Sequence, residues 1–156
     1  MILIMPNNPN RKQGNNMIFA FVDESGKPYP SEADVYPTLT AVCVNSDSIK
    51  EITQRLYSAE IKTFGEDPTF SRKLKGNDMI NFRAVREHYQ NRKIYTDEVV
   101  DIMEIYEAAV FSIVMTRPDY NPYYEPELLP NEHRFLLERL QNYGEHCKKD
   151  VLVIYD

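Results

Sequence analysis

Two carboxylates stand directly after apolar runs of the sequence: Asp23 follows Ile18–Val22, and Asp156 follows Val151–Tyr155. Continuous apolar runs of this length, rich in aromatic and β-branched residues, are typical of buried strands. If the two strands are neighbours in one sheet, the carboxylates emerge side by side at the same edge. Two close carboxylates repel each other, and either a shared proton or a divalent cation relieves the repulsion.

The chemistry that such a pair supports is metal-assisted hydrolysis. Oxygen ligands suit Mg²⁺ or Mn²⁺ better than zinc, and we predict Asp23, Glu24 and Asp156 as the ligands. Two such ions, roughly 3.5–4 Å apart, activate water and stabilise the leaving oxygen in phosphodiester cleavage. A single acid after a strand is more often an ordinary polar turn residue than a metal ligand. For this pair of acids, the turn-residue and metal-ligand interpretations both stay open. The three histidines, His88, His133 and His146, are scattered and are expected at the surface.

Three helices and four strands are predicted to position these acids. The apolar patterns predict strands at 18–22, 38–44, 108–116 and 151–155, and helices at 48–64, 96–107 and 131–148. The first two strands are expected to form an antiparallel hairpin, and the last two, joined by a helix, should be parallel. Ser48 and Glu51 predict a capping box at the start of the first helix. The layout is α/β, with a mixed sheet and helices packed on its faces.

Composition and length bound the class of protein. A chain of 156 residues with 42% hydrophobic content favours one domain, predicted at 17–156 after a polar, disordered leader at 1–16. No apolar run approaches the roughly 18 residues of a membrane span, so no membrane partner is expected. Cys43 and Cys147 lack metal-ligand spacing and predict buried free thiols in a reducing, cytoplasmic compartment.

Charge is segregated along the chain. Between residues 71 and 93, seven Lys or Arg oppose two acids, giving +5 in a chain of net charge −6; the seven are Arg72, Lys73, Lys75, Arg83, Arg86, Arg92 and Lys93. The net charge argues against non-specific coating of nucleic acid. The basic segment 72–93 is compatible with local contact to a nucleic-acid backbone, and equally with an ordinary solvated face.

Four short motifs in order carry a family resemblance: F-V-D-E-S-G at the start, T-L-T-A-V-C-V, L-K-G-N and V-I-Y-D. The chain from Met17 to Asp156 resembles domain-of-unknown-function family 3800, which is similar to the ribonuclease H-like fold. In ribonuclease H-like enzymes an acid on the first strand and another at the end of the fourth hold the catalytic metals. The resemblance implies these roles for Asp23 and Asp156, and a phosphate contact for Lys75.

The chain departs from that family at two places. Lys73 stands where the family motif Glu-x-Lys-Gly has its acid, and the family continues past Asp156 into a helix that carries a further acid. The domain is therefore expected to lack its C-terminal helix. Three hypotheses remain: a metal-dependent nuclease or phosphodiesterase using Asp23, Asp156 and Lys75; a non-catalytic binding module that kept the fold and lost the complete metal site; and an enzyme acting on small nucleotides.

Overall fold

The computed structural model describes residues 2–5, 17–25, 38–65, 89–114 and 131–155 of the chain. The chain divides into two compact units. The first, the sheet unit, comprises Met1–Ser46 and Ala108–Asp156; the second, the helix-pair unit, comprises Asp47–Glu107.

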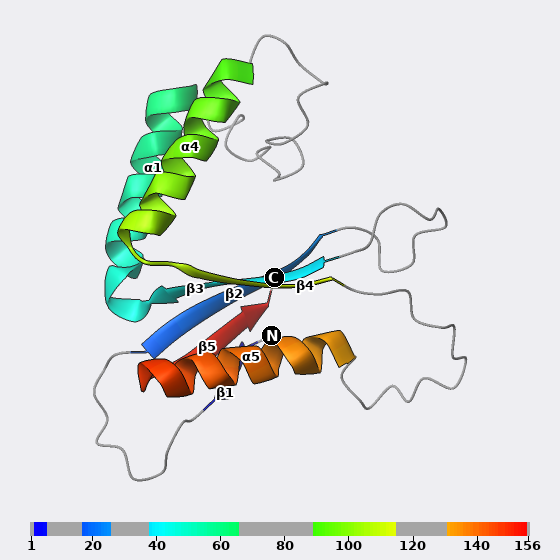
Figure 1. Cartoon of the computed structure of the whole chain (residues 1–156). Helices are drawn as coiled ribbons and strands as arrows, with labels where there is room; N and C mark the ends of the chain where they lie inside the picture. Colours follow the sequence, from blue (N-terminus) through cyan, green and yellow to red (C-terminus); the bar gives the residue numbers. More distant parts are fainter. Residues whose placement is uncertain (1, 6–16, 26–37, 66–88, 115–130, 156) are drawn as a thin grey trace, which may run out of the picture. The chain divides into compact units, whose positions relative to one another are not determined.

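The sheet unit is built on five strands (Figure 1). They are β1 (Ile2–Met5), β2 (Met17–Ser25), β3 (Thr38–Asn45), β4 (Ala109–Val114) and β5 (Asp150–Tyr155). Their order in the sheet is β1-β5-β2-β3-β4, and only the β2–β5 pair is parallel. With helix α5 (Asn131–Cys147) between β4 and β5, this is the mixed α/β architecture predicted from the sequence.

The strand directions follow the sequence prediction. β2 and β3 form the expected antiparallel hairpin, with Val22 opposite Ala41. β4 is antiparallel to β3, and β2 is parallel to β5, so β4 and β5 run in the same direction as predicted. They are not neighbours, because β2 and β3 lie between them. The helix crossover therefore carries the chain from one edge of the hairpin to the other.

Strand β1 corrects the prediction of a disordered leader over residues 1–16. Ile2–Met5 pairs antiparallel with β5, with Ile2 opposite Ile154 and Met5 opposite Val151. Even a short apolar segment can pair its backbone N–H and C=O groups with those at the outer edge of β5. Without this pairing, that edge would expose unpaired N–H and C=O groups. The polar part of the predicted leader, 6–16, lies outside the described residues.

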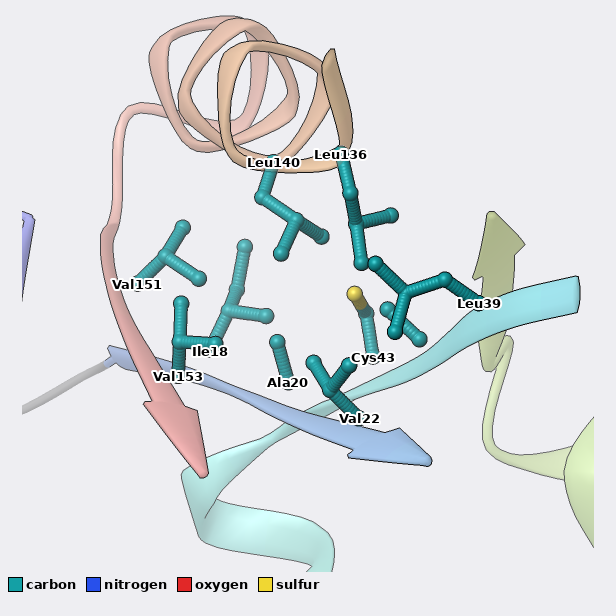
Figure 2. Close-up of a cluster of buried hydrophobic side chains, with 10 residues drawn as sticks. Ile18, Ala20, Val22, Leu39, Cys43, Leu136, Leu140, Val151 and Val153 are labelled. Carbon is teal, nitrogen blue, oxygen red and sulfur yellow. The ribbon is translucent and has the colours of Figure 1, made fainter. Parts of the chain in front are cut away.

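The core of the sheet unit lies between the sheet and α5. Alternate residues of β2, namely Ile18, Ala20 and Val22, are almost fully buried, as expected for one face of a strand. Leu136 and Leu140 point from α5 towards this face (Figure 2). The same cluster includes Leu39, Ala41, Cys43, Val151 and Val153. The burial of one strand face by α5 fixes which residues of β2 face the helix and which face away from it.

The helix-pair unit contains α1 (Ile49–Phe64) and α4 (Tyr89–Ile105), which pack side by side (Figure 1). The ring of Phe64 on α1 lies edge-on to that of Tyr95 on α4, with centroids 5.4 Å apart. The Tyr106 hydroxyl donates a 3.0 Å hydrogen bond to Glu51, a second link across the pair. α1 ends at Phe64 and is capped by Gly65, whose φ of 80° favours glycine.

Two details of these helices differ from the sequence prediction. The capping box is wrong: Ser48 belongs to a 3₁₀ turn, η1 (Ser46–Ser48), has helical dihedral angles and makes no side-chain capping bond. α4 begins at Tyr89, well before the predicted start at Thr96. The Thr96 hydroxyl donates to the carbonyl of Arg92, four residues back, so this threonine lies inside the helix and does not cap it.

Cys43 is expected to resist thiol reagents in the folded protein. Burial, with a smaller contribution from Cys147, raises the pKa of the Cys43 thiol from 9.0 to about 12. Since the thiolate is the reactive form, a Cys147→Ala variant should react with a maleimide at pH 8 only after unfolding. Because the unfolded thiol ionises near pH 9 and the folded one near 12, ionisation favours unfolding as pH rises through that window. Rapid labelling of the folded variant would contradict this prediction.

Candidate functional site

Strands β2 and β5 are parallel neighbours, as the paired-acid prediction requires. Their register places Val22 opposite Tyr155, and these are the residues directly before Asp23 and Asp156 in the sequence. Asp156 itself lies outside the described residues, so its distance from Asp23 stays a prediction. The described strands supply the backbone arrangement on which that prediction depends.

Asp23 lies on the sheet face opposite to α5. Strand alternation turns Val22 towards the helix and Asp23 away from it, onto the face that also carries Phe21. Asp23 is exposed, and its Oδ1 accepts a 2.9 Å hydrogen bond from the backbone N–H of Glu24. This bond orients the carboxylate at the end of the strand.

An open pocket of about 560 Å³ adjoins Asp23 on that face. Its size is within the range of small-molecule sites. It is lined by Phe21, Val22, Asp23, Thr40, Val42, Ile154 and Tyr155, so most of its wall is apolar. The site therefore combines the charged carboxylate of Asp23 with an adjoining apolar surface that can accept part of a bound molecule.

A row of polar side chains crosses three strands beside this pocket. The register pairs Asp23 with Thr40 on β3, and Thr40 with Ser112 on β4. The two hydroxyls are hydrogen-bonded at 2.9 Å, and either can be the donor. Carboxylate and hydroxyl oxygens are hard donors, which match the Mg²⁺ or Mn²⁺ predicted from the sequence and do not match soft metals.

Glu24 lies on the other face of β2 from Asp23. The strand continues to Ser25, so consecutive side chains point to opposite sides. A carboxylate oxygen of Glu24 lies 3.2 Å from Nε2 of His133, which belongs to the first turn of α5. The structure thus separates two of the three predicted metal ligands and gives Glu24 a different partner.

His133 completes a cluster with Glu24 and Tyr155. Its ring stacks on that of Tyr155 with centroids 5.9 Å apart and an interplanar angle of 24°. Burial, and secondarily the nearby Glu24 carboxylate, raise the pKa of the Tyr155 hydroxyl above its ordinary value of 10. The His133 side chain is 17% exposed, whereas His146 on the same helix is exposed as predicted.

Sequence reasoning missed His133 because no local motif links it to Glu24. The two residues meet only after α5 has crossed over and packed against the sheet. The one available signal was the amphipathic pattern of 131–148, which orients Leu136 and Leu140 inwards and constrains the position of His133 on the same helix. That pattern gives no indication of a carboxylate partner.

The remaining predicted site residues are only partly described. Lys75, Lys73 and most of the basic segment 72–93 lie outside the described residues. Two basic residues of this segment are described, and both lie on α4. Nζ of Lys93 lies 3.7 Å from a carboxylate oxygen of Asp97, and Arg92 is half-buried. Within the described ranges, no group of three or more His, Cys, Asp or Glu side chains is close enough to hold a metal ion.

Fold and site together define a mixed α/β protein in which β2 and β5 are parallel neighbours and Asp23 lies near the end of β2. Comparison of the chain with protein-family models, curated proteins and solved structures finds no match. No helix in the part of the chain that the structure describes is long and apolar enough to cross a membrane.

Proposed function

We propose that this protein is a metal-dependent phosphodiesterase or nuclease of ribonuclease H-like fold, with Asp23 and Asp156 as metal ligands. The observation that carries the proposal is the parallel pairing of β2 with β5, with Val22 opposite Tyr155. An acid follows each of these paired residues in the sequence. In a parallel pair, residues one step beyond opposite positions are expected side by side on the same face.

The order of the strands supports the ribonuclease H-like assignment. Counting from β2, the chain makes three antiparallel strands, crosses through α5 and returns as a fourth strand beside the first. Asp23 is on this first strand, and Asp156 follows the fourth. These are the two positions at which ribonuclease H-like enzymes carry acids.

Each residue has a defined task in this proposal. Asp23 and Asp156 would hold Mg²⁺ or Mn²⁺, and the ion would supply the Lewis acidity that phosphodiester hydrolysis requires. The Glu24 amide holds the Asp23 carboxylate in place through the bond to Oδ1. The largely apolar pocket beside Asp23 would cover one side of the bound substrate and displace water there. Lys75 would contact the phosphate, and the segment 72–93 would contact a nucleic-acid backbone.

One observation favours a second candidate, the binding module without catalysis. Because Glu24 faces α5 and pairs with His133, it is not available beside Asp23 as the sequence analysis expected. A site of few carboxylates binds divalent cations weakly. The binding module would retain the pocket at Asp23 and contact to nucleic acid while lacking hydrolysis.

A cleavage assay with controlled metal content tests the proposal. The full chain would be incubated with labelled single-stranded RNA, single-stranded DNA, duplex DNA and a chromogenic phosphodiester, each with Mn²⁺, Mg²⁺ or a chelator. We expect cleavage with Mn²⁺ or Mg²⁺, its loss on chelation and its recovery when metal is restored. Binding of nucleic acid without cleavage would favour the binding module, and cleavage of the small diester alone would indicate a small-nucleotide substrate.

A further inference from the structure

His133 contacts residues at the ends of both strands of the parallel pair. Its Nε2 lies 3.2 Å from a carboxylate oxygen of Glu24 on β2, and its ring stacks on Tyr155 of β5. Glu24 directly follows Asp23, and Tyr155 directly precedes Asp156. One side chain on α5 therefore contacts the neighbours in sequence of both proposed metal ligands.

These contacts lie next to the last described pair of the backbone ladder between the strands. Among the described residues, the last β2–β5 pair is Val22 with Tyr155. In the described part of the chain, Glu24 lies beyond that pair and is connected to β5 through the His133 ring. The His133 side chain thus adds a bridge between the ends of β2 and β5 to the backbone pairing that already holds these strands.

The contacts of the two ring nitrogens of His133 indicate a structural task for the ring. Nδ1 is buried and has no hydrogen-bond partner within the described part of the chain. The proton is therefore best placed on Nε2, which donates to Glu24. Nε2 is engaged by Glu24 and Nδ1 is buried, so within the described part of the chain the contacts of the ring are with the protein itself.

We propose that His133 is a positioning residue for the site at Asp23: by bridging Glu24 and Tyr155, it fixes the relative placement of the two strand ends that lead into Asp23 and Asp156. This inference rests on the proposed function for its effect on metal binding. Residues that orient metal ligands without touching the metal typically contribute about 10–100-fold in affinity, and His133 is expected to act in this range.

Two substitutions separate the hydrogen bond from the ring. His133→Gln keeps an N–H donor near the position of Nε2, whereas His133→Phe keeps the stacking ring and loses the donor. We expect Mn²⁺ affinity to fall about tenfold or more in His133→Phe and to recover most of this loss in His133→Gln. His146→Phe, at an exposed histidine of the same helix, is the matched control and should bind Mn²⁺ like the wild type.

Thermal unfolding of the same proteins distinguishes positioning from general stability. If His133 acts by positioning the strand ends, the Mn²⁺ affinity of each variant should depend on whether residue 133 has an N–H donor and not on the melting temperature of the variant. Wild-type affinity in His133→Phe would overturn the proposal, as would affinities that decline in step with melting temperature in both variants.

Hydrogen exchange separates failure of this inference from failure of the proposed function. If the wild type neither binds Mn²⁺ nor cleaves any substrate, the proposed function fails, but the bridge is still measurable. Amides at the ends of β2 and β5 should then exchange faster in His133→Phe than in the wild type and in His146→Phe. Unchanged exchange at both strand ends would overturn the bridge itself.

Discussion

Replacing Asp23 by Asn should lower Mn²⁺-dependent cleavage by more than about 100-fold, because loss of a direct ligand exceeds the 10–100-fold effect typical of residues that only orient ligands. The substitution preserves shape: the amide oxygen of Asn can still accept the bond from the Glu24 N–H. It removes the negative charge that is proposed to bind the cation. The strand should therefore stay intact while the site loses its metal, and steady-state kinetics at several Mn²⁺ concentrations measure the loss.

A matched control for Asp23 is Asp101, an exposed acid on α4 in the helix-pair unit. Asp101→Asn makes the same chemical change and should keep full activity. An unchanged melting temperature in Asp23→Asn would show that the loss of cleavage activity comes from the site and not from unfolding. Equal cleavage by Asp23→Asn and the wild type would remove Asp23 from the site and, with it, the main support for the nuclease proposal.

The strand that carries Asp23 was predictable, because its apolar run is continuous and its hairpin partner has the same β-branched character. Burial of Ile18, Ala20 and Val22 by α5 then follows from strand alternation. The apolar run predicted a strand that ends at Val22, with Asp23 and Glu24 together beyond its end as metal ligands. The structure continues pairing to Ser25, opposite Thr38, and this extension places the two acids on opposite faces.

Features that depend on tertiary contacts were not predictable in the same way. β1 consists of four residues, and only the free edge of β5 gives it a partner. The pairing of Glu24 with His133 depends on where α5 crosses the sheet, which no pattern along the chain specifies. By contrast, the shared direction of β2 and β5 follows from general rules of chain connection once the strands and α5 are known. Their adjacency does not, because β5 pairs with β2 and not with β4, the strand that precedes it in the chain.

Truncating Leu136 to Ala is expected to destabilise the protein by about 2–5 kcal/mol, the usual cost of removing a fully buried leucine side chain. Leu136 is 0% exposed and belongs to the cluster that joins α5 to the sheet (Figure 2). The cost combines lost transfer free energy with the cavity left between helix and strands. Urea unfolding followed by circular dichroism gives the change in the free energy of unfolding.

Phe135 provides the control for Leu136, because it is the preceding residue of the same helix and is 55% exposed. Phe135→Ala removes a larger side chain, yet it should change the free energy of unfolding by only about 0.5 kcal/mol, as is usual for surface positions. A comparable decrease in the free energy of unfolding in the two variants would contradict the orientation of α5 in the structure. Since that orientation also brings His133 to Glu24, the Leu136–Phe135 comparison tests the helix placement on which the bridge between the strand ends depends.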